Sequence, residues 1–140
     1  MLLALWFHDA IYQPKRNDNE DKSADWGAEV LARAGAPASV VDRFRGLVLA
    51  TRHEAQPQSA DARLLVDIDL SILGAEPARF DEYEAQVRKE YAHVPDLFFR
   101  MGRAKILKHF LARPAIYSTA SFRDRFEARA RTNLQRSLSK

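Results

Sequence analysis

The sequence contains no cysteine, only five glycines and no long run of apolar residues. Without cysteine, a disulfide scaffold, a thiolate metal site and a cysteine nucleophile are all excluded, and a reducing compartment fits this absence. The glycines form no phosphate-binding loop. No apolar run approaches the ~20 residues that a membrane-spanning helix needs. The opening segment MLLALWF has neither the basic start nor the cleavage site of a signal peptide. We therefore expect a cytoplasmic protein that does not contact the membrane.

The composition is that of a globular protein. Of the 140 residues, 46% are hydrophobic and 29% are charged, which excludes whole-chain disorder and predicts one domain with a core. The net charge is +3, and six basic but only two acidic residues lie between Thr119 and Lys140. In that stretch Phe122 and Phe126 are four residues apart, as on a helix face that docks onto a core. The charge distribution therefore does not favour nucleic acid as a partner.

The spacing of apolar residues predicts an all-α protein. Apolar residues recur at intervals of three and four, and no stretch alternates with a period of two. The expected helices span residues 1–12, 22–34, 37–53, 60–73, 77–91, 95–112 and 120–138. The first is apolar nearly all round, which is typical of a buried helix. Because chain ends normally lie at the surface, we expect an upstream segment or a second chain to cover it.

Polar residues interrupt the apolar pattern at three places. His8 and Asp9 follow LWF, Asp67 and Asp69 lie within LLVDIDLSIL, and His53 ends the segment VLATRH. An unpaired buried carboxylate costs several kcal/mol, so such residues need a cation, a metal ion or hydrogen bonds. Residues two apart on a helix point in different directions, so we expect either Asp67 or Asp69 to be solvated.

His8, Asp9 and Asp69 together offer one imidazole and two carboxylates. This donor set suits a divalent ion such as Mn, Fe, Ni, Zn or Mg. An ion with open coordination positions lowers the pKa of a bound water to about 7 and polarises a phosphoryl oxygen. A simpler alternative stays open, in which His8 is a buried histidine bonded to a carbonyl and Asp9 pairs with an arginine.

Eight segments of the chain resemble, in order and in spacing, one branch of the HD superfamily, the predicted metal-dependent HD phosphohydrolases. The segments are LWFHDAIY, DNEDKSA, ATRH, LLVDIDLSILG, VRKEYAHVPD, FFRMGRAKILKHFL, RPAIYSTASF and ARTNL. The resemblance covers nearly the whole chain. It implies a single helical domain over residues 1–140, a bundle of about six helices, and hydrolysis of a small phosphate ester or nucleotide by a metal-activated water.

The resemblance implies that His8 and Asp9 are the metal-binding HD pair and that Asp69 is the final metal-binding aspartate. Asp67 competes with Asp69 for that assignment or orients the water. The first metal-binding histidine of the superfamily lies upstream of the HD pair and has no counterpart here. The resemblance therefore also implies a domain that lacks its first helix or helices and keeps three protein ligands.

Further residues match the family at single positions. Glu20 is implied to be a general base or to orient water, and Asn19 to contact substrate; alternatively, Glu20 is an acidic residue favoured at a helix N-terminus. His53 would hold a second ion or a phosphate oxygen, or would interact with a helix end. Arg103 would clamp a phosphate, with a surface ion pair as its alternative.

Two classes of function follow from these residues. The first is a metal-dependent phosphohydrolase. The second is a truncated or degenerate HD domain that serves as a non-catalytic binding or interaction module. For the second class, an uncovered apolar first helix would favour self-association into a homo-oligomer.

Overall fold

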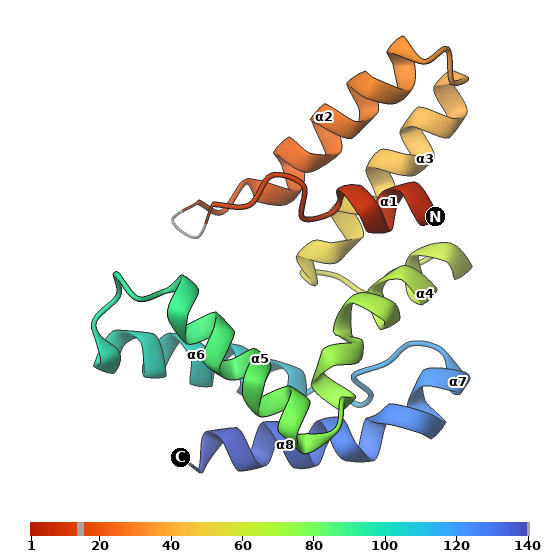
Figure 1. The fold of residues 1–140 in the computed structure, drawn as a ribbon. Helices are drawn as coiled ribbons and strands as arrows, with labels where there is room; N and C mark the ends of the chain where they lie inside the picture. Colours follow the sequence, from red (N-terminus) through yellow and green to blue (C-terminus); the bar gives the residue numbers. More distant parts are fainter. Residues whose placement is uncertain (14–15, 140) are drawn as a thin grey trace. The chain divides into compact units, whose positions relative to one another are not determined.

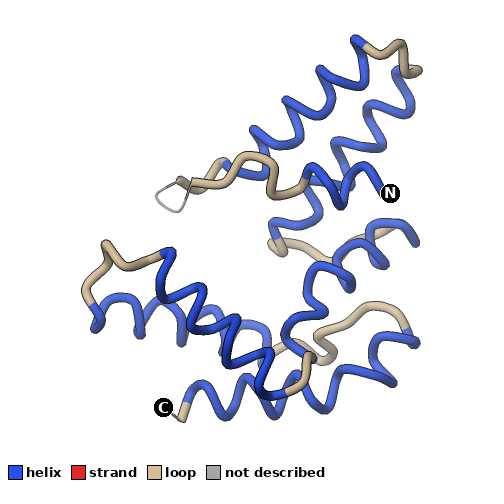
Figure 2. Tube along the Cα trace, in the orientation of Figure 1, coloured by secondary structure: helices blue, strands red, loops and turns tan. Residues whose placement is uncertain are grey.

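The computed structural model describes residues 1–13 and 16–139. Over these residues the chain consists of helices and loops without any strand (Figure 2), which confirms the prediction of an all-α protein. Within the same ranges, no helix is both long and apolar enough to cross a membrane. The sequence predicts one domain; the structure divides into two compact units, Met1–Asp69 and Leu70–Lys140, each with its own buried side chains.

The first unit is built around a helical hairpin. Its elements are α1 (Leu2–Phe7), α2 (Asn19–Arg33), α3 (Ala38–Leu49), the 3-10 helix η1 (Ala50–Arg52) and α4 (Ala60–Asp69). Helices α2 and α3 lie side by side (Figure 1). Between them Gly35 has φ +79°, the left-handed conformation that glycine adopts without steric cost after a helix.

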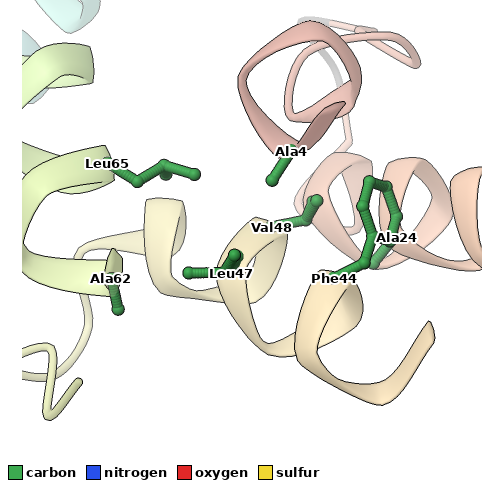
Figure 3. Close-up of a cluster of buried hydrophobic side chains, with 7 residues drawn as sticks. All are labelled: Ala4, Ala24, Phe44, Leu47, Val48, Ala62 and Leu65. Atoms are coloured by element: carbon green, nitrogen blue, oxygen red, sulfur yellow. The ribbon is translucent and has the colours of Figure 1, made fainter. Parts of the chain in front are cut away.

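The core of the first unit collects side chains from all four α-helices (Figure 3). Its buried members are Ala4, Ala24, Phe44, Leu47, Val48, Ala62 and Leu65. Gly27 in α2 allows the closest contact, because a Cβ there would lie 2.6 Å from Phe44 Cε1 and 3.1 Å from Phe7 Cδ1. The Phe7 ring packs against Phe44 and Trp26, with centroids 5.7 and 5.2 Å away. Aromatic packing therefore holds the end of α1 against the hairpin.

The predicted extent of the first helix, residues 1–12, is wrong, whereas its cover by an upstream segment or a second chain stays a prediction. Helix α1 ends at Phe7, and only Ala4 is buried, whereas Leu2 and Trp6 are 72% and 84% exposed. The helix stops because the chain beyond it bonds to α2: the backbone of Ile11 pairs with a side chain of α2 instead of continuing the helical ladder. Helical periodicity does not reveal such competition from a distant segment.

The second unit is also helical. Its elements are the 3-10 helix η2 (Leu70–Gly74), α5 (Pro77–Glu90), α6 (Asp96–Leu111), α7 (Ala120–Phe122), the π-helical turn η3 (Arg123–Glu127) and α8 (Ala128–Leu138). Its buried apolar side chains include Phe80, Leu107, Phe110, Ile116, Tyr117 and Leu134. The buried Tyr117 hydroxyl donates to the Leu70 carbonyl at 3.0 Å.

Polar side chains of α8 satisfy backbone carbonyls of neighbouring segments. The amide of the buried Asn133 donates to the carbonyls of Leu73 and Ala75, both at 2.9 Å. The Arg131 guanidinium donates to the Leu111 carbonyl at 3.0 Å. Buried carbonyls without a partner are costly, so these contacts give part of the positive charge near the C-terminus a structural role.

Candidate functional site

His8 lies directly after α1 and is oriented by the backbone of its own helix. Its Nδ1 donates to the Leu5 carbonyl at 2.7 Å, because a carbonyl oxygen can only accept. Its Nε2 therefore faces two carboxylates, with Asp9 Oδ2 at 3.1 Å and Asp69 Oδ1 at 3.3 Å. The hydrogen bonds to Asp69 and Asp9 raise the pKa of His8 to about 10. In this arrangement His8 is an imidazolium at neutral pH.

Asp69 is the last residue of α4, and its carboxylate lies between two imidazoles. Oδ1 faces His8 Nε2, and Oδ2 lies 2.8 Å from His53 Nε2. Burial alone would raise the pKa of Asp69, but the hydrogen bonds from His53 and His8 outweigh it and lower the pKa to about 2. We call His8, Asp9, His53 and Asp69 the histidine–aspartate cluster.

His53 joins the cluster from a strained turn. It follows η1 with φ +57°, and it is the one non-glycine residue with positive φ in the described part of the chain. This conformation costs about 1 kcal/mol for a residue with a Cβ and persists only where surrounding contacts support it. The imidazole is mostly buried and contacts Asp69. A strained residue that presents a titratable side chain to a charged cluster is typical of functional sites.

The strain at His53 leads to a stability prediction. We expect His53→Gly to be more stable than His53→Ala by about 1 kcal/mol. Both variants remove the imidazole and its contact with Asp69, but only glycine adopts a positive φ without a Cβ clash. Urea denaturation of the two variants measures the difference. The usual order, with alanine the more stable, would contradict a left-handed turn at this position.

The donor atoms of the cluster are of the types that bind divalent ions. In this structure, however, they contact one another. Imidazole nitrogen and carboxylate oxygen suit such ions, and the bond from His8 Nδ1 to a carbonyl is the usual support of a metal-binding histidine. In the described residues, however, no group of three or more His, Asp or Glu side chains is arranged to hold an ion as it stands. Binding an ion requires His8 to lose its Nε2 proton.

Asn19 and Glu20 lie in the first turn of α2, and the Asn19 side chain bonds the backbone of Gln13. Asn19 Oδ1 accepts from the Gln13 N–H and Nδ2 donates to the Gln13 carbonyl, both at 3.0 Å. The side chain of Asn19 is therefore engaged with backbone, and its role in substrate binding stays a prediction. Glu20 is half-buried in the same turn, and its role as a general base also stays a prediction.

The expectation that Asp67 or Asp69 is solvated is wrong. Asp67 is fully buried, and the Asp69 side chain is only 22% exposed. Leu65, Val66 and Asp67 are consecutive buried residues, so α4 is covered around most of its circumference near its end. Being fully buried, Asp67 has no access to substrate in this arrangement. The structure thus brings Asp69 together with His8, Asp9 and His53.

Arg103 belongs to α6 in the second unit and is engaged with Glu84. Its guanidinium forms a mostly buried ion pair with the Glu84 carboxylate, with Nε 3.2 Å from Oε1, and lies 5.5 Å from the centre of the Tyr83 ring. The predicted phosphate clamp would need Arg103 to exchange this partner. Its role in substrate binding stays a prediction.

Sequence reasoning missed two contacts that support the cluster. Arg52, immediately before His53, forms an ion pair with Asp21 in α2. The buried Ser23 hydroxyl accepts from the Ile11 N–H at 3.0 Å and donates to the Ile11 carbonyl at 3.3 Å. Only the position of Arg52 beside a candidate histidine could have drawn attention to it, since no spacing rule links it to α2.

Comparison of the chain with models of known protein families, with curated proteins and with solved structures found no match.

Proposed function

We propose that this chain is a metal-dependent phosphohydrolase of the HD type that acts on a small phosphate ester or nucleotide. The observation that supports it best is the meeting of His8, His53 and Asp69, which come from the end of α1, the turn after η1 and the end of α4. Three titratable side chains from separate segments, two of them with strongly shifted pKa values, are typical of a functional site.

His8, Asp9 and Asp69 would hold the ion, whose identity among Mn, Fe, Ni, Zn and Mg is open. Such an ion lowers the pKa of bound water and polarises a phosphoryl oxygen. The Leu5 carbonyl keeps His8 Nε2 directed at the carboxylates. Asp9, whose side chain is 65% exposed, can turn toward the ion at little cost.

Two further residues would act on substrate and water. His53 Nε2, which contacts Asp69, would exchange that carboxylate for a phosphoryl oxygen, donate a hydrogen bond to it and so neutralise part of its charge. Glu20, carried on the first turn of α2, accepts a proton from the attacking water. What supports a role for Glu20 is that its neighbours Asn19 and Ser23 bond the segment that follows Asp9.

The metal content of the purified chain tests this proposal. After incubation with Mn²⁺ or Ni²⁺ and desalting, we expect about one ion per chain and metal-dependent hydrolysis of p-nitrophenyl phosphate or of a nucleotide. Asp9→Ala should lose both. Asp42→Ala, which changes an exposed carboxylate of α3 outside the cluster, should keep both. Equal metal content and turnover in Asp9→Ala would refute the ligand assignment.

A second candidate function, a non-catalytic interaction module, is favoured by the surface of α1. Leu2, Leu3 and Trp6 are 72%, 50% and 84% exposed. Leu2 and Leu3 line a groove of about 470 Å³ together with mainly apolar side chains, among them Leu31 and Phe44. Exposed apolar surface of this kind marks interaction sites. On this proposal the chain self-associates through α1 without hydrolysing phosphate esters.

Light scattering at rising protein concentration separates the two candidates. The interaction module predicts a mass above that of one chain for the parent and a monomer for Trp6→Asp. Leu97→Asp, which changes an apolar residue of α6 that is 67% exposed, serves as the control and should associate like the parent. A monomeric parent at all concentrations excludes self-association through α1.

A further inference from the structure

The ion pair between Arg52 and Asp21 joins the residue before His53 to α2, the helix that also bonds the segment after Asp9. We infer that Arg52 and Asp21 are positioning residues, whose pairing sets the direction in which His53 presents its imidazole to Asp69. The consequence of this positioning for catalysis rests on the proposed function. The geometry that it describes exists without metal or substrate.

The turn at His53 needs support from outside the turn. His53 has the left-handed φ of +57° that residues with a Cβ rarely adopt. Within the turn its N–H makes a long hydrogen bond of 3.4 Å to the Ala50 carbonyl. Arg52 is the adjacent residue, and its guanidinium reaches Asp21 in α2. A contact at the neighbouring residue restrains the backbone rotation that would release His53 from Asp69.

The first turns of α2 are also hydrogen-bonded to the segment that directly follows His8 and Asp9. Asn19 bonds both the N–H and the carbonyl of Gln13, and Ser23 does the same for Ile11. Asp21 lies midway between Asn19 and Ser23 in sequence. The same two turns of helix therefore hold the chain that follows Asp9 and, through Asp21, the chain that precedes His53.

The free energy that the Arg52–Asp21 ion pair can contribute indicates which role fits it. The Arg52 and Asp21 side chains are 29% and 43% exposed, and partly exposed ion pairs change an equilibrium by about fivefold at most. Such a contribution is small for the stability of the unit. It is comparable with the cost of the left-handed backbone at His53, which is also about fivefold in an equilibrium. A positioning role therefore fits the pair better than a general stabilising role.

The first unit contains a matched control for this pair. Arg45 in α3 forms an ion pair with Asp25 in α2, and these side chains are 41% and 61% exposed. This pair also joins α2 to a following segment, but Arg45 lies well before the turn at His53 in α3. Arg45→Gln should therefore reproduce the loss of a surface ion pair without any effect on His53.

The test measures the His53 imidazole in the metal-free protein. Long-range ¹H–¹⁵N spectra report the ring nitrogens of His53 and His8 separately. In Arg52→Gln and in Asp21→Asn we expect the Nε2 resonance of His53 to move toward that of a solvent-exposed histidine. Arg45→Gln should leave it unchanged, with a melting temperature close to that of Arg52→Gln. The double variant Arg52→Asp/Asp21→Arg should restore the parent spectrum.

Cobalt titration gives the second readout. Arg52 acts on the ligand Asp69 only through His53, which contacts Asp69 at 2.8 Å. We therefore expect Arg52→Gln to weaken Co²⁺ binding by about 10-fold at most, the lower end of the loss for residues that orient a metal ligand, while Arg45→Gln binds like the parent. An unchanged His53 resonance in both Arg52→Gln and Asp21→Asn overturns the positioning role, whether or not Co²⁺ binds. A parent that binds no Co²⁺ and hydrolyses no phosphate ester, but whose His53 resonance responds to Arg52→Gln, defeats the proposed function and leaves the positioning role standing.

Discussion

Asp69→Asn should reduce metal-dependent turnover by at least about 100-fold and should lower the metal content of the purified chain. The substitution keeps the size of the side chain but removes the negative charge that lies between two imidazoles, His8 at 3.3 Å and His53 at 2.8 Å. The two imidazoles face different oxygens of Asp69, and in asparagine one of these oxygens is replaced by an NH₂ group, so one imidazole loses its acceptor on this side chain. Metal analysis and a phosphatase assay on parent and variant measure the effect.

Asp67→Asn is the control, because Asp67 and Asp69 are the two candidates for the final metal-binding aspartate. Asp67 is fully buried two residues earlier in α4. We expect Asp67→Asn to change stability while metal content per folded chain stays that of the parent. The reverse result, with metal lost in Asp67→Asn and kept in Asp69→Asn, would transfer the ligand role to Asp67 and would refute the cluster as the metal site.

The stability of the metal-free protein should depend on pH in a direction set by His8. Hydrogen bonds to Asp69 and Asp9 raise the pKa of His8 from 6.5 to about 10. Its contribution to stability is therefore complete below pH 6.5 and is lost as the pH rises toward 10. The pKa of Asp69 is lowered from 3.8 to about 2, so its contribution is complete above pH 3.8 and is lost as the pH falls toward 2. The cluster stabilises the fold most between about pH 4 and pH 6.5.

Urea denaturation of the protein in EDTA at pH 6 and pH 9 tests this dependence. The free energy of unfolding should fall between the two pH values by more than about 1.4 kcal/mol, which corresponds to one pKa unit. His8→Gln should show a smaller fall, and the difference between the two proteins removes the effect of other titrating groups. A parent profile that is flat, or that rises toward pH 9, would contradict the paired imidazolium.

The helical class and part of the candidate site could be predicted from the sequence. Apolar spacing and the positions of proline and glycine predict helices close to those observed for α3, α5 and α6, because these signals act within a few residues of chain. His8 and Asp69 were singled out because a charged group in an apolar helix needs a partner. The structure brings these two together. Their role in holding a metal ion stays a proposal.

Features that depend on distant segments could not be predicted in this way. The end of α1 at Phe7 depends on Ser23 and Asn19, which bond the chain beyond it. The burial of Asp67 beside a mostly buried Asp69 depends on what covers α4, and helical spacing says only that the two point apart. Both expectations failed for the same reason, since periodicity describes one helix at a time.

The sequence by itself determined which residues carry charge in apolar surroundings and which segments are helical. Only the tertiary structure decided that His53 meets Asp69 across a separation of 16 residues, and that Arg52 and Asp21 tie that turn to α2. Spacing rules hold only while the chain keeps one regular conformation. Between His53 and α4 the backbone turns through a left-handed residue and a loop, so the meeting of these side chains depends on packing of the first unit as a whole.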